Sequence, residues 1–530
     1  MIERVLLDNG CFYQGGAEQP GLQSLLVEDG IIRAIAAPDA FSAALRRTSK
    51  KIDLQGQTVL PGLTDSHLHL MFLADQLSAV DCETGSLQEC LERVRAKTRA
   101  LSPGDWIIGY GWNQNAWQPA RYGTAAELES VSSGHPAVLY AKSLHASWAN
   151  ETALRAAGID ANSPDPDGGR ILRDERGNPT GILLENAMQL VDKFVPPLAG
   201  KRLEGMLKNA QNQLLSYGIT SVHDFDREAC YKALQALDAA GELILRVRKN
   251  LHGEHLAEII AEGLRSGSGS EHLFLGSLKY FADGALGPQT AAMLTPYENS
   301  DSTGILLMDA DEVFTQAARA SAAGWPLAIH AIGDLAVRSV LDGFARLRAW
   351  EEVNKLPHLP QRIEHVQIIA PEDQPRLKAL GVIASMQPLH ATSDMFTADH
   401  HWGARSANAY ALNSLLQLGT LLIFGSDAPV ESANPFLGLH AALTRRRVSG
   451  EPGEEGWYPR QRIPLVQALN AYTSSPARSC GLGGSLGRVA VGYRADLTVL
   501  PRSPFLIDPH DLARLLPEMT LVDGKVVFQV

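Results

Sequence analysis

The stretch "PGLTDSHLHL", residues 61–70, carries two histidines one residue apart, His67 and His69. On a β-strand alternate side chains share a face, so both imidazoles would point the same way. Imidazole nitrogen is a common ligand of zinc and other borderline divalent ions. Histidines also satisfy hydrogen bonds in protein cores, so the pair alone leaves both interpretations open.

Four further polar residues favour metal binding, because each lies in or just after a short apolar run. They are Lys279 in "LKYFADG", His330 in "LAIHAIGD", His365 in "RIEHVQ" and Asp427 in "IFGSDAPV". Barrel enzymes assemble their active sites at the carboxyl ends of several strands. Four imidazoles and a carboxylate that meet there would suit a divalent metal, with zinc as the expected ion and one or two ions per chain.

The elements that must position these residues are eight apolar runs rich in Val, Ile, Leu or Phe. They cover residues 58–70, 218–225, 243–251, 273–284, 325–334, 362–369, 381–388 and 420–430. Helix-like segments separate them, for example "DEVFTQAARASAAG" before the fifth run. Strands that alternate with helices and are buried on both faces predict an α/β fold, the (β/α)₈ TIM barrel.

Three domains are expected. Both chain ends contain apolar runs joined at Asp-Gly, "SLLVEDGIIRAI" and "MTLVDGKVVFQV", which are strong hairpin signals. We expect residues 1–60 and 476–530 to form one composite β-sandwich and residues 61–80 and 201–475 to form the barrel. The first and second runs lie roughly 150 residues apart, too far for a structureless loop. Residues 81–200 are therefore expected to be an inserted α+β, lid-like domain.

Several residues have two open interpretations. Trp112 and Trp117, in "GYGWNQNAWQPARYG", form either an aromatic mini-core of the insert or an apolar lid that contacts substrate. His145, in "LHASWAN", is either a substrate contact or a structural residue. Three histidines follow the seventh run, and a loop that carries them could touch substrate or be inert. These are His390, His400 and His401.

Composition narrows the class of protein. The chain has 530 residues and a net charge of −12, which argues against nucleic acid or an anionic membrane as the main partner. Its five cysteines are scattered and contain no CxxC, so a reducing compartment is expected. No secretory signal or membrane-length apolar run is visible. We expect a cytoplasmic protein with a small-molecule substrate, and a homodimer is one assembly to consider.

The ligand pattern resembles that of the amidohydrolase superfamily: HxH on the first barrel strand, Lys on the fourth, His on the fifth and sixth, and Asp on the eighth. The segments "GYGWNQNAW", "DPDGGRILRDERGNPTGIL", "KYFADGALG" and "HAIGD" resemble the branch that holds N-substituted formamide deformylase and the YtcJ-like proteins. One departure is visible, because that branch often shows Ser-Arg after "DGALG", where this chain has Pro288 and Gln289. If the arginine of that branch contacts substrate, the departure predicts a different ligand for this chain.

The resemblance implies a role for each matching residue. His67, His69 and Asp427 would hold one metal, and His330 and His365 would hold a second. A Lys279 carboxylated on its amine would bridge the two ions; an ion pair with Asp283 is the alternative.

The reaction implied is hydrolysis of a non-peptide carbon–nitrogen bond by metal-bound hydroxide. Asp427 would accept and return a proton. The metal, with His365 or His145, would polarise the substrate carbonyl. Other outcomes are a lactone, ester or cyclic-amide hydrolase, a deaminase, or a non-catalytic binding protein of the same fold.

Overall fold

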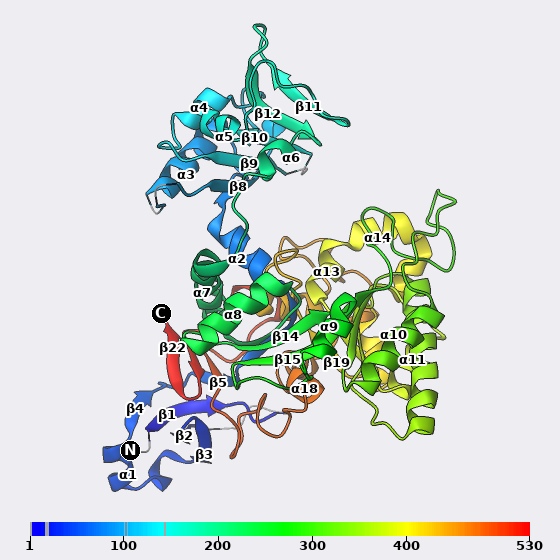
Figure 1. Ribbon diagram of the computed structural model, residues 1–530. Coiled ribbons are helices and arrows are strands. Elements are labelled where there is room, and N and C mark those ends of the chain that lie inside the picture. The colour runs from blue at the N-terminus through cyan, green and yellow to red at the C-terminus, as the bar shows by residue number, and fades with distance from the viewer. Residues whose placement is uncertain (1–2, 16–20, 100, 103, 143–144) are drawn as a thin grey trace. The chain divides into compact units, whose positions relative to one another are not determined.

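The computed structural model describes the chain except for residues 1–2, 16–20, 100, 103 and 143–144 (Figure 1). The chain divides into two compact units, one formed by Met1–Phe72 with Leu207–Val530 and the other by Leu73–Met206. The divisions fall within helices α2 (Leu70–Ser78) and α7 (Gly200–Ser216). None of the described helices is both long and apolar enough to cross a membrane.

The larger unit contains the predicted eight-stranded parallel barrel sheet. In spatial order its strands are β6 (Leu63–Leu68), β13 (Ile219–Asp224), β14 (Arg246–His252), β15 (Leu273–Phe281), β16 (Leu327–Ala331), β17 (Arg362–His365), β18 (Ile383–Met386) and β19 (Leu422–Phe424). Beyond β19, Asp427 donates its N–H to the His67 carbonyl at 2.7 Å and so brings the last strand against the first. The predicted fold class is confirmed.

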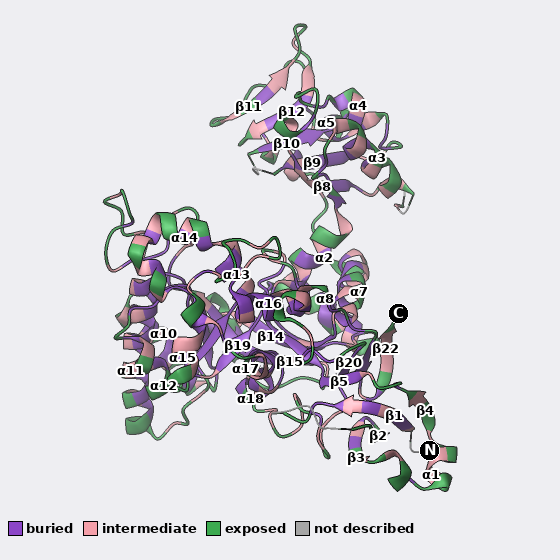
Figure 2. Ribbon diagram, turned by 180° about the vertical axis from the view of Figure 1, so that it is seen from behind, coloured by how far each residue is buried: buried purple, intermediate pink, exposed green. Residues whose placement is uncertain are grey.

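Helices cover this sheet, and buried strands lie inside partly exposed helices (Figure 2). Their bounds are α8 (Glu228–Ala239), α9 (Leu256–Ala261), α10 (Ala310–Ala322), α11 (Asp334–Asn354), α12 (Gln374–Ala379), α13 (Pro388–Ser393), α14 (Met395–Trp402), α15 (Leu412–Gln417), α16 (Pro435–Thr444), α17 (Leu465–Tyr472) and α18 (Ser474–Ser479). Local signals explain their limits. In α10, for example, the Asp309 side chain accepts from the N–H groups of Asp311 and Glu312, while Val313 and Ala317 are buried.

The two chain ends share a second sheet. Its strands are β1 (Arg4–Phe12), β2 (Gln23–Glu28), β3 (Ile31–Ala36), β4 (Lys50–Asp53), β5 (Thr58–Pro61), β20 (Leu497–Leu500), β21 (Met519–Val522) and β22 (Lys525–Gln529). Strand β20 pairs antiparallel with β5, so strands from the two chain ends share one sheet. Both Asp-Gly turns have the positive φ angles of a type I′ hairpin, with 47° and 79° at Asp29-Gly30.

The first apolar run, residues 58–70, is two strands and not one. Strand β5 belongs to the composite sheet, whereas β6 begins the barrel after Gly62. A Cβ atom on Gly62 would lie 2.2 Å from the Thr220 hydroxyl oxygen, so only glycine lets the chain pass β13 at this point.

The smaller unit has its own six-stranded sheet. The strands are β7 (Val80–Asp81), β8 (Ile107–Trp112), β9 (Ala137–Ala141), β10 (Ala146–Ala149), β11 (Gly169–Arg173) and β12 (Pro179–Glu185), with α3 (Leu87–Thr98), α4 (Ala125–Glu129), α5 (Glu151–Ala156) and the short α6 (Gln189–Asp192). The turn-rich tract after residue 162 contains the hairpin β11–β12.

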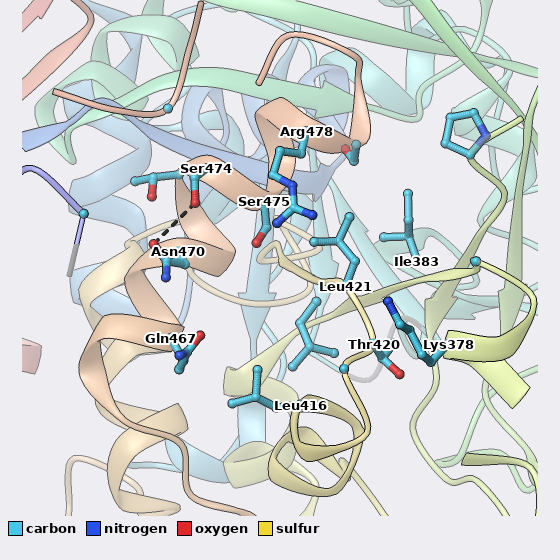
Figure 3. Close-up of a pocket in the computed structure, with 18 of the residues that line it drawn as sticks. Lys378, Ile383, Leu416, Thr420, Leu421, Gln467, Asn470, Ser474, Ser475 and Arg478 are labelled. Carbon is cyan, nitrogen blue, oxygen red and sulfur yellow. Dashed lines mark hydrogen bonds between the residues drawn. The ribbon is translucent and has the colours of Figure 1, made fainter. Parts of the chain in front are cut away.

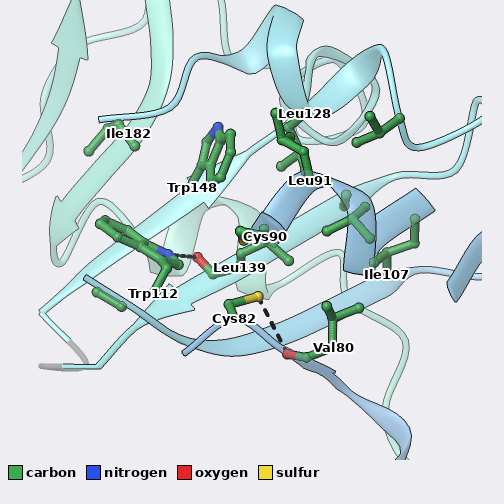
Figure 4. Close-up of a cluster of buried hydrophobic side chains, with 14 of the residues drawn as sticks. Val80, Cys82, Cys90, Leu91, Ile107, Trp112, Leu128, Leu139, Trp148 and Ile182 are labelled. Atoms are coloured by element: carbon green, nitrogen blue, oxygen red, sulfur yellow. Dashed lines mark hydrogen bonds between the residues drawn. The ribbon is translucent and has the colours of Figure 1, made fainter. Parts of the chain in front are cut away.

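Both tryptophans weighed as lid residues lie in the hydrophobic core of this unit, and each is 1% exposed. The Trp112 indole N–H donates to the Leu139 carbonyl at 2.8 Å (Figure 4). The Trp117 indole N–H donates to the Thr84 hydroxyl at 3.2 Å. Because both rings are buried and both N–H groups are satisfied within the unit, the structure favours the mini-core interpretation. It gives no support to the substrate-binding role of Trp112 and Trp117.

Candidate metal centre

Three of the predicted ligands converge at the carboxyl ends of β6 and β19. The Nε2 atoms of His67 and His69 lie 3.5 and 3.4 Å from Asp427 Oδ1. An ion with tetrahedral bonds of ~2.0–2.1 Å separates its ligand atoms by about 3.4 Å, so these gaps fit a metal. His67 Nε2 is buried and has no hydrogen-bond partner among the described residues. The donor set and its spacing therefore suit a divalent ion.

The backbone brings Asp427 to this position. Asp427 has a φ of 60°, a left-handed conformation that aspartate tolerates better than most residues. Two residues earlier, a Cβ on Gly425 would lie 2.4 Å from the His67 amide nitrogen. Ser426 donates from its hydroxyl to Asp65 at 2.5 Å and so joins the turn to β6. Glycine and this hydrogen bond together let β19 approach β6 closely.

His67 is held by a buried ion pair that the sequence analysis missed. Its Nδ1 donates to Glu364 Oε2 at 2.6 Å, and Arg362 donates from Nε to Glu364 Oε1 at 2.5 Å. Burial, with the positive charge of Lys279, lowers the pKa of His67 to about 4 despite the nearby Glu364. A neutral His67 with its proton on Nδ1 leaves the Nε2 lone pair facing Asp427, the state that a metal ligand requires.

His69 sits between two carboxylates. Its Nδ1 lies 3.3 Å from Asp226 Oδ1, and Asp226 Oδ2 accepts the Met71 N–H at 2.5 Å. Burial lowers the pKa of His69, but Asp226 and Asp427 outweigh it and raise the pKa to about 9. Burial also opposes ionisation of Asp427, but the His69 hydrogen bond and neighbouring imidazoles hold its pKa well below the usual range. Without a metal, a protonated His69 would therefore lie beside an ionised Asp427.

A second group of ligand atoms contains His365, His390 and Asp427. His365 donates from Nδ1 to Gln387 Oε1 at 3.0 Å, which leaves its Nε2 lone pair available. His390 accepts at Nδ1 from Gln367 at 3.4 Å, so its Nε2 carries a proton. This buried Nε2 lies 3.9 Å from Asp427 Oδ2 and has no hydrogen-bond partner in the described structure.

His390 thus differs from the other two histidines weighed after the seventh run. Helix α13 begins with Pro388 directly after β18 and turns His390 into the barrel mouth, where it is 5% exposed. His400 and His401, on α14, are exposed and half-buried. Proline at the first helical position was the available signal for a helix there.

His330 and Lys279 also reach this mouth. The ring of His330 lies 4.6 Å from that of His365, and its Nε2 donates to the Gly284 carbonyl at 2.9 Å. The Lys279 ammonium lies over the rings of Phe225 and Phe281, at 4.7 and 4.8 Å, and burial lowers its pKa to about 8.

The alternative partner of Lys279 is already engaged elsewhere. Asp283 accepts the backbone N–H groups of Ala292, Ile332 and Gly333. No ion pair between Lys279 and Asp283 occurs among the described residues. Carboxylation of Lys279 and a second ion on His330 and His365 remain predictions.

His145, the remaining predicted site residue, belongs to the smaller unit. Its Nδ1 lies 3.0 Å from Glu185 Oε2 on β12, and its side chain is 71% exposed. The proposed contact of His145 with substrate remains a prediction.

An eight-stranded parallel barrel with histidines and an aspartate gathered at the strand ends defines a metal-dependent hydrolase. The chain belongs to the amidohydrolase family, whose model matches residues 50–528. It is 31% identical to the protein YtcJ of Bacillus subtilis, over 99% of both chains. It is 29% identical to N-substituted formamide deformylase of Arthrobacter pascens, over 96% of this chain and 95% of that protein.

Solved structures agree with this assignment. An uncharacterized metal-dependent hydrolase from Pyrococcus furiosus superposes with a TM-score of 0.76 and 29% identity, over 94% of this chain and 99% of that one. A second, from Pyrococcus horikoshii, gives a TM-score of 0.77 and 28% identity, over 96% and 99%. The protein is therefore a hydrolase that uses a divalent metal.

Proposed function

We propose that this hydrolase cleaves an amide-like carbon–nitrogen bond of a small molecule, with N-substituted formamides as the nearest analogue and zinc as its metal. His67, His69 and Asp427 would hold the ion. The observation that carries the proposal is the ionised Asp427 carboxylate, whose Oδ1 lies 3.5 and 3.4 Å from the Nε2 atoms of His67 and His69, the separation expected between ligands of one ion. When bound, a divalent ion supplies an acidified water and polarises a carbonyl.

The surrounding side chains supply the proton transfers. Asp427 is ionised, so its Oδ2 can accept a proton during attack and return it to the leaving nitrogen. The His390 Nε2–H lies 3.9 Å from that oxygen, too far for a hydrogen bond to it, and can donate to a substrate oxygen as negative charge develops there. His365, fixed by Gln387, faces the same space.

We further propose that Lys279 carries a carboxylate on Nζ and bridges to a second ion on His330 and His365. A pKa of about 8 leaves part of the amine neutral near neutral pH, and only the neutral amine reacts with carbon dioxide. Carboxylation reverses the charge of a side chain that otherwise stays cationic beside the metal ligands. A ¹³C signal from labelled carbon dioxide, present in the native protein and absent in Lys279→Ala, would test this.

The substrate class rests on the formamide deformylase relative, which is 29% identical. The Pro288-Gln289 departure leaves room for a different acyl or amine group. We therefore propose to screen the zinc-loaded protein against formamides, N-acyl amino acids, simple amides and lactones. Turnover of an amide that is lost in His67→Ala supports the proposal, whereas turnover of lactones alone would refute it. We also propose a cytoplasmic location.

A further inference from the structure

We propose that a cleft at the opposite end of the barrel binds a small molecule through its phosphoryl group. The cleft has a volume of about 500 Å³ and is lined at the amino-terminal ends of β18 and β19 and by helices α17 and α18 (Figure 3). This volume lies within the usual range for small-ligand sites. The inference is independent of the proposed reaction, because the metal ligands lie at the other ends of these strands.

The charge of the cleft has one sign. Lys378, Arg478 and Arg488 line it, and no acidic side chain occurs among its described lining residues. None of the three cations has an ion pair or hydrogen bond within the described structure. In a chain with a net charge of −12, three unpaired cations around one cleft form a local positive potential.

Neutral donors accompany these cations. Ser475 is 8% exposed, and its hydroxyl has no partner among the described residues. Figure 3 places it beside the Arg478 guanidinium, with the Lys378 ammonium on the far side of Leu421. The Thr420 hydroxyl is buried and has no partner in the described structure. A buried hydroxyl without a partner is costly and is expected to be satisfied by an occupant or water.

The combination of groups selects the ligand chemistry. The planar Arg478 guanidinium and the neighbouring Ser475 hydroxyl match the acceptor oxygens of a phosphoryl group, and the Lys378 ammonium adds positive charge across Leu421. Ile383, Leu416 and Leu421 form an apolar wall that suits the remainder of a small phosphate ester. Strand β18 leads to Gln387, which holds His365, and β19 leads to Asp427. An occupant would thus contact the starts of two strands that lead to site residues. Four residues of strand at ~3.3 Å each place the start of β18 about 13 Å from Gln387.

The test is calorimetric titration of the full-length protein with inorganic phosphate, pyrophosphate and a hexose phosphate. Phosphate also binds metal ions, so the His67→Ala variant is titrated in parallel to remove the contribution of the candidate metal centre. We expect one site per chain in His67→Ala, and the same site, with or without a second one at the metal centre, in the parent protein. Arg478→Gln and Lys378→Gln should each raise the dissociation constant at least tenfold. If the hexose phosphate binds more tightly than inorganic phosphate, the natural ligand is a phosphate ester. If inorganic phosphate binds more tightly, the ligand is the free ion.

Arg502→Gln is the matched control, because Arg502 is exposed, carries the same charge and lies outside the cleft. It should bind like the parent protein. Three results would overturn the proposal: equal weakening by Arg502→Gln, binding lost in His67→Ala but kept in Arg478→Gln, or no binding of any probe at millimolar concentration. Lys378→Gln, in a second helix, keeps the test decisive if Arg478→Gln fails to fold.

Discussion

Glu364→Gln is the most informative single substitution in the barrel, because Glu364 joins a buried arginine to His67, a candidate metal ligand. Removing its charge weakens the hold on His67 Nδ1, which is now 2.6 Å from a carboxylate oxygen. Loss of such an outer partner typically costs 10–100-fold in metal affinity, or about 1.4–2.7 kcal/mol. Arg362, fully buried, also loses its ionised partner. Breaking a buried pair costs about 3–5 kcal/mol of folding stability, and the shape of glutamine favours the lower end.

A matched control separates these two effects. Glu351 is also fully buried, accepts from Arg348 at 2.7 Å and lies on α11, away from the metal ligands. Glu351→Gln should lower stability in denaturant unfolding but leave zinc affinity, measured by competition with a fluorescent chelator, within about twofold. Glu364→Gln should lower both. Unchanged zinc affinity in Glu364→Gln, or an equal drop in Glu351→Gln, would show that the carboxylate does not orient His67.

Other perturbations test the remaining parts. His67→Ala and His69→Ala should each lose metal by elemental analysis while the barrel still folds; full occupancy in the double variant would contradict the site. His69 has a pKa of about 9 without metal, so below that pH zinc must displace its proton, and zinc affinity should rise about tenfold per pH unit between pH 7 and 8. Calorimetric titration with zinc in buffers of different ionisation enthalpy should show that about one proton is released. Zinc binding without proton release would contradict this prediction. Lys279→Ala should lose activity, and short carboxylic acids should restore part of it. Trp117→Ala should destabilise the smaller unit by about 3–5 kcal/mol with little change in the Michaelis constant, whereas the reverse would revive the lid interpretation.

Much of the barrel could be predicted from the sequence, because strands buried on both faces leave a plain signal. Each is an apolar run, and its first functional polar residue falls where the strand ends. His67, His330 and Asp427 were selected as candidate site residues in this way. The join between β5 and β6 was not, since Gly62 lies within a continuous apolar run and its role depends on Thr220, which is distant in sequence.

Glu364 was missed for a local geometric reason. In an ideal strand Glu364 and His365 point to opposite faces, so a sequence that places His365 in the site places Glu364 outside it. In the structure His365 has a φ of 74° and Val366 a φ of 44°. These left-handed residues end the alternation, so Glu364 faces the barrel interior while His365 still turns into the mouth. Positive φ at residues other than glycine or asparagine has no reliable sequence signal.

The charged residues beneath the site explain how the centre can stay ordered without its ion. Arg362 donates to Glu364, to the Ser66 carbonyl and to the Ser385 hydroxyl, so one guanidinium ties β17 to β6 and β18. Burying such a pair gains little net stability, because desolvation offsets the attraction. Its value is geometric, since a satisfied buried network permits one arrangement, whereas an apolar core would tolerate several. We infer that this barrel accepts charge in its interior because the imidazole of His67 must already be oriented when the metal arrives.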